Sequence, residues 1–151
     1  MEDYSMEKVI NKFDGEYEFL SNFAQCTVVY DGNIYPTVEH AYQAAKSLDK
    51  SIQKSFTTLP TPGKAKKLGK QIQLRPDWEQ VKDNVMKALL KQKFSQEPFK
   101  SQLIATGNTK LVEGNTWNDT YWGVCGGKGL NMLGTLLMEV RSELIEEISN
   151  L

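Results

Sequence analysis

The sequence has few of the residues that build disulfide frameworks and metal sites. It contains two cysteines, Cys26 and Cys125, and one histidine, His40. Two cysteines cannot form the framework of a small secreted domain, and this set is too small for the usual ligands of a structural zinc ion. We therefore expect reduced thiols, no metal ion and no cofactor.

The sequence also lacks long apolar stretches. No run approaches the ~18 residues that cross a bilayer, and the first ten residues, MEDYSMEKVI, are acidic and without the apolar stretch of a signal peptide. We expect a cytoplasmic protein with no membrane partner. The formal net charge of −1 provides no global positive field for nucleic acid, although a local patch could still hold phosphates.

The composition is typical of a folded globular chain. Hydrophobic residues make up 40% and charged residues 25% of the 151 residues, and no repeat, linker or charge block divides them. We predict a single compact domain over residues 1–151.

Local patterns predict a mostly helical α+β fold with a few short strands. The expected β segments are Val9–Phe13, a hairpin of Cys26–Tyr30 and Ile34-Tyr35 around Asp31-Gly32-Asn33, and Leu111-Val112. Pro36 is expected to end the hairpin strand, and Thr37 to cap a helix that includes Lys46.

Further helices follow from proline, glycine and apolar spacing. We expect them at Gly63–Gln71 after Thr61-Pro62, from Pro76-Asp77 to about Phe94, and from Pro98 to Gly107. The second of these should bury Trp78, Val81, Val85, Ala88 and Leu89. A C-terminal helix should bury Leu130, Leu133, Leu137, Val140, Leu144 and Ile148. Between the last two, Thr109–Lys128 is irregular, as functional loops often are.

One candidate chemical site lies on the predicted helix after Thr37. Glu39, Gln43 and Lys46 recur at i, i+4 and i+7, which turns a carboxylate, an amide and an amine to one face, with Tyr42 beside them. The alternative is a solvated face with a weak surface ion pair. His40 points away from this face and is expected to be structural.

A second candidate is the loop Gly114–Gly123, which carries Trp117, Asn118, Asp119 and Trp122. Aromatic rings can stack on a base, and a carboxylate can bind ribose hydroxyls or stabilise positive charge at an anomeric carbon. The alternative is a small hydrophobic core that pins the loop.

Two weaker features suggest anion binding. Glycines such as Gly127, in the turn before the C-terminal helix, could let backbone amides approach an anion, although a flexible turn explains them as well. The other feature is basic: Lys64, Lys66, Lys67 and Lys70 surround a short helix, with Arg75 shortly after. A solvated face is the alternative there.

Several segments together resemble the NADAR family, also called YbiA-like. They are Phe19–Phe23, Glu39–Lys46, Leu74–Trp78, Leu111–Trp117, Trp122-Gly123 and Asn131–Met138. The resemblance runs from about Phe13 to Arg141 and implies the YbiA-like fold.

The resemblance also implies N-glycosidase chemistry. Activities of the family include cleavage of early riboflavin-pathway intermediates and removal of ADP-ribose from guanine in nucleic acid. Carried over by position, the family's acidic residue is Glu39, its lysine is Lys46, and its loop tryptophan and aspartate are Trp117 and Asp119. The Leu-Ser-Asn-Phe segment, with Ser21, Asn22 and Phe23, is expected to line the same pocket.

From these residues and the resemblance we predict hydrolysis of the bond between a phosphorylated ribose and a base or amine. The substrate that we expect from the resemblance is ADP-ribose on guanine in nucleic acid. Glu39 is the predicted acid/base and Asp119 stabilises charge or orients water, while Trp117 or Trp122 stacks on the base. Lys46 either holds Glu39 ionised or attacks C1′ as a Schiff-base nucleophile. Tyr42, Gln43, Asn118, Gly127, Lys67 and Arg75 complete the predicted substrate contacts.

Three alternatives stay open at this point. The first is an N-glycosidase acting on riboflavin-pathway intermediates or NAD-derived small molecules. The second is a non-catalytic ADP-ribose-binding module. The third is an interaction protein that docks a partner through the loop aromatics.

Overall fold

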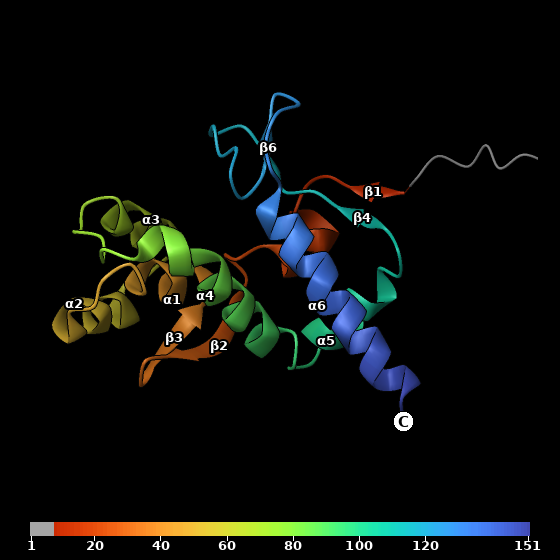
Figure 1. Ribbon diagram of the computed structural model, residues 1–151, viewed down its shortest axis with the longest axis horizontal. Coiled ribbons are helices and arrows are strands. Elements are labelled where there is room, and N and C mark those ends of the chain that lie inside the picture. Colours follow the sequence, from red (N-terminus) through yellow and green to blue (C-terminus); the bar gives the residue numbers. More distant parts are fainter. Residues whose placement is uncertain (1–7) are drawn as a thin grey trace, which may run out of the picture. The chain divides into compact units, whose positions relative to one another are not determined.

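The computed structural model describes residues 8–151 (Figure 1). The chain forms two compact units: the described part of unit 1 comprises residues 8–20 and Ser101–Leu151, and unit 2 is Ser21–Lys100. Most of the polar N-terminal stretch, on which the expectation of no signal peptide rests, lies outside the described residues. The prediction of one domain over residues 1–151 stays a prediction.

Unit 2 opens with a β-hairpin, as the sequence predicts. Strands β2 (Gln25–Tyr30) and β3 (Asn33–Thr37) pair antiparallel around a two-residue turn. Asp31 has φ 50° and Gly32 has φ 85°, so both turn residues are left-handed. That is the type I′ geometry, whose twist matches that of the paired strands.

Pro36 does not end the hairpin strand, contrary to the prediction. β3 continues to Thr37, and the register shifts between the pairs Val28–Tyr35 and Gln25–Thr37. The shift places an extra residue of β2 opposite Pro36. A bulge is one of the few places where a sheet tolerates a residue without an N–H donor, which explains why the strand survives.

The helical part of unit 2 follows directly (Figure 1). Its elements are α1 (Val38–Ala44), α2 (Lys50–Ser55), η2 (Phe56–Thr58), α3 (Pro62–Gly69) and α4 (Trp78–Lys93). Both predicted threonine caps are confirmed: Thr37 Oγ1 accepts from His40 N at 3.0 Å, and Thr61 Oγ1 accepts from Lys64 N at 3.1 Å. α1 packs against the hairpin, α3 and α4.

Helix α1 ends earlier than predicted. Its last residue is Ala44, and Lys46 lies in the turn beyond it, where Lys46 N donates to Gln43 O at 3.2 Å. Two side chains hold the backbone out of the helix after this turn. Gln53 Nε2 donates to Ser47 O at 2.7 Å, and Ser47 Oγ accepts from Asp49 N at 3.0 Å.

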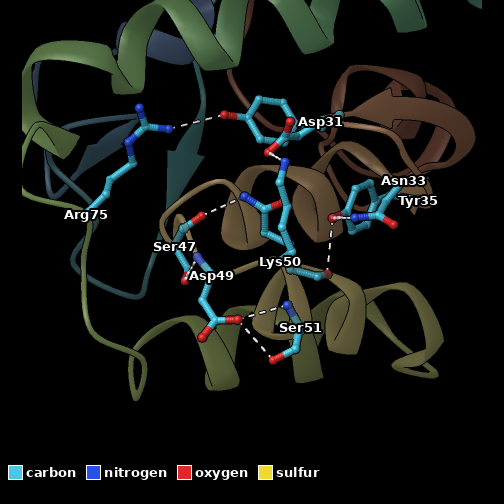
Figure 2. Close-up of polar contacts among 10 residues, drawn as sticks. Asp31, Asn33, Tyr35, Ser47, Asp49, Lys50, Ser51 and Arg75 are labelled. Carbon is cyan, nitrogen blue, oxygen red and sulfur yellow. Dashed lines mark hydrogen bonds and ion pairs between the residues drawn. The ribbon is translucent and has the colours of Figure 1, made fainter.

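Helix α2 was not predicted, and its start is visible in Figure 2. Asp49 Oδ1 caps it by accepting from Ser51 N at 2.8 Å (Figure 2). The same oxygen accepts from Ile52 N at 3.3 Å. Lys50 forms an ion pair with Asp31 of the hairpin turn, and Tyr35 OH donates to Gln53 O at 3.1 Å. These contacts join α2 to the hairpin.

The buried face of α4 differs from the predicted one. Its buried residues are Trp78, Met86, Leu89, Leu90 and Lys93. Trp78 and Leu89 were predicted, but Val81 and Val85 are only half-buried and Ala88 is exposed. The buried face of α4 is rotated from the predicted one toward Lys93, because the Lys93 ammonium has a hydrogen-bond acceptor inside the fold.

Unit 1 contains two short parallel strand pairs and the C-terminal helix (Figure 1). β1 (Val9–Ile10) pairs with β4 (Lys110–Leu111), and β5 (Gly114–Asn115) pairs with β6 (Val124–Cys125). The remaining elements are η1 (Gly15–Leu20), α5 (Phe99–Ala105), within which the boundary between the units falls, and α6 (Met132–Ser149). Gly107, with φ 63°, follows α5 as expected.

Helix α6 is amphipathic, with a buried face shorter than predicted. Leu133, Leu137, Val140 and Leu144 are buried as expected, whereas Leu130 and Ile148 are 65% and 47% exposed. Leu130 precedes the helix and Ile148 lies in its last turn. The apolar period therefore continues beyond the part of α6 that is packed.

These elements confirm the predicted α+β class, mostly helical with a few short strands. Among residues 8–151, no helix combines the length and apolarity that crossing a membrane requires.

Candidate functional site

The predicted acidic and amide residues of α1 meet, and they are buried. Gln43 Nε2 donates to Glu39 Oε2 at 2.6 Å. Glu39 is 8% and Gln43 5% exposed, and every residue of α1 is buried. The solvated-face interpretation is therefore wrong, because a carboxylate in this position has lost most of its contact with water.

The oxygen of the Gln43 amide is a buried hydrogen-bond acceptor without a donor among the described residues. Gln43 Oε1 is buried, and no group among residues 8–151 donates to it. The oxygen lies against α3 where that helix has a glycine: a Cβ on Gly69 would overlap Oε1 and lie 2.7 Å from Gln43 Cδ. A buried acceptor without a donor is costly, and a ligand hydroxyl or N–H could satisfy it.

Lys46 lies near Glu39 and Gln43, in the turn after α1, and these three residues are called the Glu39 wall below. Its ammonium lies 5.7 Å from the centroid of the Tyr42 ring. Burial lowers the pKa of Lys46, and the Glu39 carboxylate opposes that shift. Three neighbouring ammonium groups lower the pKa further, those of Lys70, Lys66 and Lys82. The amine is thus nearer to deprotonation than an exposed lysine.

The predicted segment around Trp78 packs against Tyr42 and bonds to the backbone of Lys46. The Tyr42 and Trp78 rings pack at 5.2 Å between centroids, with their planes inclined at 55°. Arg75 N donates to Lys46 O at 2.7 Å, which ties the backbone at Lys46 to the start of α4. Tyr42 is 5% exposed, so it acts mainly as a packing surface for Lys46 and Trp78.

Asn22 of the Leu-Ser-Asn-Phe segment lies beside Glu39, while the expectation that the segment lines a substrate pocket stays a prediction. Asn22 O accepts from Glu39 N at 3.1 Å, and Asn22 Nδ2 donates to Met86 Sδ at 3.6 Å. Asn22 Oδ1 is a second buried acceptor without a donor among the described residues. Ser21 Oγ accepts from Phe23 N at 3.0 Å, and Phe23 is 43% exposed.

Sequence reasoning missed a residue that supports this segment, Lys93. It is completely buried, its Nζ donates to Ser21 O at 2.7 Å, and the Phe94 and Phe99 rings lie 5.1 Å from the ammonium. Burial raises the pKa of the Cys26 thiol, and Lys93 opposes that shift. Its position four residues after Leu89 places it on the buried stripe of α4 and could have identified it.

Arg75 and Lys67 do not join the Glu39 wall. The Arg75 guanidinium binds Asp77 through both carboxylate oxygens, at 2.6 and 3.0 Å. It also donates to Tyr30 OH at 3.3 Å (Figure 2). Hydrogen bonding to Asp77 raises the pKa of Arg75 and lowers that of Asp77. Lys67 is exposed on α3. Their contact with substrate stays a prediction.

His40 is structural, as expected. Its Nδ1 lies 2.7 Å from Thr37 Oγ1 and its Nε2 3.0 Å from Leu59 O. The residue is 1% exposed, and burial lowers the pKa of its imidazole.

In unit 1, the predicted loop is organised by Asn115. Its Oδ1 accepts from Trp117 N at 3.2 Å and Asp119 N at 3.1 Å. Its Nδ2 donates to Glu113 Oε2 and to Asp119 O, both at 2.9 Å. One amide side chain therefore sets the backbone course of the predicted loop residues.

Asp119 continues this order. Its Oδ1 accepts from Tyr121 N at 3.1 Å and Trp122 N at 2.9 Å. The Tyr121 and Trp122 rings pack edge to face at 4.9 Å and are half-buried. Trp117 is 55% exposed, and Asn118, at φ 65°, is exposed too. Both earlier interpretations thus apply in part: Tyr121 and Trp122 form a small core, while Trp117 presents ring surface outward.

Two supporting residues of the loop were missed, Asn131 and Gly123. Asn131 Nδ2 donates to Leu111 O and its Oδ1 accepts from Glu113 N, both at 2.9 Å. A Cβ on Gly123 would overlap Glu113 Oε2 and lie 2.7 Å from Asn115 Nδ2. Gly123 and Asn131 belong to segments that carry the family resemblance, which was the available signal.

The glycines before α6 form a turn. Gly126 and Gly127 have φ 59° and 78°, and Cys125 and Lys128 exchange backbone hydrogen bonds of 2.9 and 3.1 Å across them. The first amides of α6 are already used: Met132 N donates to Tyr121 O and Leu133 N to Trp122 O, at 3.0 and 2.9 Å. The geometry favours the turn interpretation, and a substrate contact by Gly127 stays a prediction.

Unit 1 also has a hollow of about 640 Å³ between β1, η1 and α5. Glu16, Tyr17 and Phe19 line one side of it and Gln102 and Thr106 another. No residue predicted to contact substrate lines it.

The predicted site residues thus form one set in each unit. In unit 2, Asn22 adjoins Glu39, and Glu39 adjoins Gln43 and Lys46. In unit 1, the set comprises Trp117, Asn118, Asp119 and Trp122. Within residues 8–151, no three His, Cys, Asp or Glu side chains gather as metal ligands would, and both cysteines are free.

This sequence and site define a member of the NADAR family: the NADAR domain matches residues 10–145, nearly the whole chain. The chain is 43% identical over 136 residues to N-glycosidase YbiA of Escherichia coli, which covers 87% of this chain and 84% of that protein. An N-glycosidase of Nostoc punctiforme is 40% identical over 136 residues, covering 85% and 86%.

Two further comparisons bear on fold and biology. The NMR structure of Escherichia coli YbiA aligns with a TM-score of 0.83 at 40% identity, covering 95% of this chain and 88% of that one. The YbiA-like fold is thereby confirmed. A riboflavin biosynthesis protein of Vibrio vulnificus is 38% identical over 137 residues, 88% of this chain but 37% of that longer protein.

Proposed function

We propose that this chain is a hydrolase of N-glycosyl bonds, which cleaves the bond between C1′ of a phosphorylated ribose and the nitrogen of a base or amine. The observation that carries the proposal is the buried Glu39 carboxylate, hydrogen-bonded to Gln43 and adjoined by the desolvated Lys46. The names of the Escherichia coli and Nostoc punctiforme relatives support the reaction class.

Breaking such a bond builds positive charge on the ribose and negative charge on the leaving nitrogen. Glu39 gives a proton to that nitrogen as the C1′–N bond breaks. A water oxygen then bonds to C1′, and its proton returns to Glu39. The hydrogen bond from Gln43 fixes the orientation of the Glu39 carboxylate, so that one rotamer serves both proton transfers.

Lys46 has two possible roles in this scheme. As an ammonium it stabilises the ionised form of Glu39 after proton transfer. As a neutral amine, which its lowered pKa favours, it attacks C1′ and displaces the base, whose nitrogen takes the proton of Glu39. The ribosylamine so formed gives its N–H proton to Glu39 while its C1′–O4′ bond breaks and O4′ takes a proton, which yields the imine. Water then hydrolyses the imine to the sugar aldehyde and frees the Lys46 amine. Borohydride during turnover separates the two: a Lys46 adduct in mass spectrometry supports the imine, and an active Lys46→Arg enzyme excludes it.

In unit 1, we assign Asp119 to charge stabilisation or water orientation and Trp117 to stacking on the base. The support is the family resemblance together with the ordered loop that presents both residues. The exposed ring of Trp117 suits stacking, because a base needs an accessible π-face.

For the substrate we propose ADP-ribose attached to guanine in nucleic acid. A second candidate, a phosphorylated ribosyl-aminopyrimidine of riboflavin synthesis, is favoured by the name of the Vibrio vulnificus relative. The testing experiment offers each compound separately to wild type and to Glu39→Gln. Mass spectrometry measures the sugar that is released, which is ADP-ribose from the oligonucleotide and ribose 5-phosphate from the aminopyrimidine.

The outcomes of that experiment are distinct. Release by wild type alone from the oligonucleotide supports the nucleic-acid substrate, and release from the aminopyrimidine alone supports the second candidate. Glu39→Gln keeps the side-chain volume and a hydrogen-bonding partner for Gln43 while removing the titratable proton. Equal release by both proteins would refute the role of Glu39, and saturable binding without release would favour a non-catalytic module.

A further inference from the structure

Four lysines approach the Glu39 wall from three elements of unit 2. Lys46 follows α1, Lys66 belongs to α3, Lys70 is the exposed residue directly after α3, and Lys82 belongs to α4. The packing of the helices against α1 explains why these side chains, out of the many on the surface, come together.

The approach of α3 is set by Gly69. Because a Cβ there would overlap the Gln43 amide, the α3 backbone comes directly against Gln43. Lys66 precedes Gly69 by three residues and Lys70 follows it by one, so at 100° per residue the two lie on one flank of the glycine. Lys64 and Lys67 lie on the far side of α3 and are exposed.

The approach of α4 is set by Trp78. Its ring packs on Tyr42, and Lys82 lies one turn further along the same face of α4. Lys82 Nζ donates to Glu79 Oε1 at 2.8 Å, and the Lys82 side chain is only 13% exposed. The Lys82 side chain is thus held along α4 and does not extend into solvent.

Ammonium groups that lie close together repel each other. The charges of Lys70, Lys66 and Lys82 each lower the pKa of Lys46 in this way. A bound anion would offset this repulsion. Phosphate is the suitable class, because a phosphate monoester carries close to two negative charges and a diphosphate bridge carries one on each phosphate. Both accept hydrogen bonds at several oxygens, which matches point-charge donors such as lysine.

We propose that Lys66 and Lys70, with Lys82, form a phosphate subsite next to Lys46, which holds the phosphate of the ribose substrate. The proposal rests on the proposed function for the identity of that substrate. It places the phosphate on one flank of α3 and gives no such role to Lys67 or Arg75.

The kinetic test compares three double variants that each remove two positive charges. Lys66→Gln/Lys70→Gln alters the subsite, Lys64→Gln/Lys67→Gln alters the other flank of α3, and Lys54→Gln/Lys91→Gln alters exposed positions on other helices. For the subsite variant we expect KM for a phosphorylated substrate to rise about tenfold or more, with kcat nearly unchanged. KM for the dephosphorylated substrate should not change.

A binding test does not depend on turnover. Ribose 5-phosphate and ribose are titrated into each protein, and the thermal midpoint and NMR chemical shifts are followed. We expect ribose 5-phosphate, but not ribose, to stabilise wild type and the Lys54/Lys91 variant, and the effect to disappear in the Lys66/Lys70 variant.

The results separate the two proposals. If ribose 5-phosphate binds through Lys66 and Lys70 but no substrate is hydrolysed, the subsite stands and the proposed hydrolysis fails. If ribose 5-phosphate does not stabilise wild type, or if the Lys64/Lys67 variant loses binding equally, the subsite is overturned whatever the hydrolysis assay gives.

Discussion

Gly69 offers the sharpest test of how the site is held together. In Gly69→Ala the new Cβ overlaps Gln43 Oε1 and lies 2.7 Å from Gln43 Cδ and 3.2 Å from Gln43 Cβ. The neighbouring atoms belong to a side chain with little room, since Gln43 is 5% exposed. The Gln43 amide must therefore rotate or α3 must shift, and either movement breaks the 2.6 Å hydrogen bond to Glu39.

The magnitude follows from two opposed effects. Alanine in a helix is favoured over glycine by about 1 kcal/mol, whereas a hydrogen bond to a charged group contributes about 1.5–3 kcal/mol. We expect a net loss of about 0.5–2 kcal/mol in the free energy of unfolding, which lowers Tm by roughly 1–8 °C for a chain of this length. Activity should fall more than stability, because Glu39 loses its fixed orientation.

The same helix supplies the control. A Cβ on Gly63 meets only Thr61 Oγ1, at 3.9 Å, so Gly63→Ala has space and should not lower Tm. Thermal unfolding by circular dichroism and the hydrolysis assay measure both variants. The double variant Gly69→Ala/Gln43→Ala should be no less stable than Gln43→Ala, because the overlapping atoms are gone. Wild-type Tm and activity in Gly69→Ala, or additive losses in the double variant, would refute this reasoning.

Three other predictions concern charges. Burial lowers the pKa of Lys46 in the folded state, so the charged lysine destabilises the fold until the pH passes its ordinary pKa of 10.5. Lys46→Met removes this charge and should therefore raise Tm at pH 7. The gain in Tm should shrink as the pH approaches 10.5. A Tm gain that grows with pH would contradict this sign. Lys93→Met removes the donor to Ser21 O, so hydrogen exchange at the Glu39 amide should accelerate about tenfold, while the exposed Lys91→Met has no such effect. Unchanged exchange would exclude a positioning role. Asp119→Asn keeps an oxygen that accepts from the Tyr121 and Trp122 amides, so its Tm should match that of wild type while its kcat falls at least about tenfold. Asp119→Ala removes that oxygen and should lower both Tm and kcat. Full activity in Asp119→Asn would show that the charge of Asp119 plays no part in the mechanism.

Local sequence determined most element positions. The Asp31-Gly32 turn, the Thr37 and Thr61 caps and Gly107 act within a few residues of themselves, so their effects are readable without the fold. The spacing of Glu39 and Gln43 likewise ensured that the two side chains meet once α1 formed.

Other features depended on partners distant in sequence. β3 continues through Pro36 because β2 bulges opposite it, and α1 ends at Ala44 because Gln53 and Asp49 bind around Ser47. The buried face of α4 includes Lys93 because Ser21 O accepts a hydrogen bond from its ammonium and two phenylalanine rings pack against it. No local pattern distinguishes such a lysine from a solvated one.

The same division applies to the candidate site. The sequence by itself determined the chemical groups, their spacing and the family to which they belong. Only the tertiary structure decided that the Glu39 face is buried, that Gly69 brings α3 against Gln43, and that Arg75 binds Asp77 while Lys66 and Lys70 approach Lys46. Burial and pairing depend on which surfaces the packed helices cover, and helical spacing can identify a face but not what covers it.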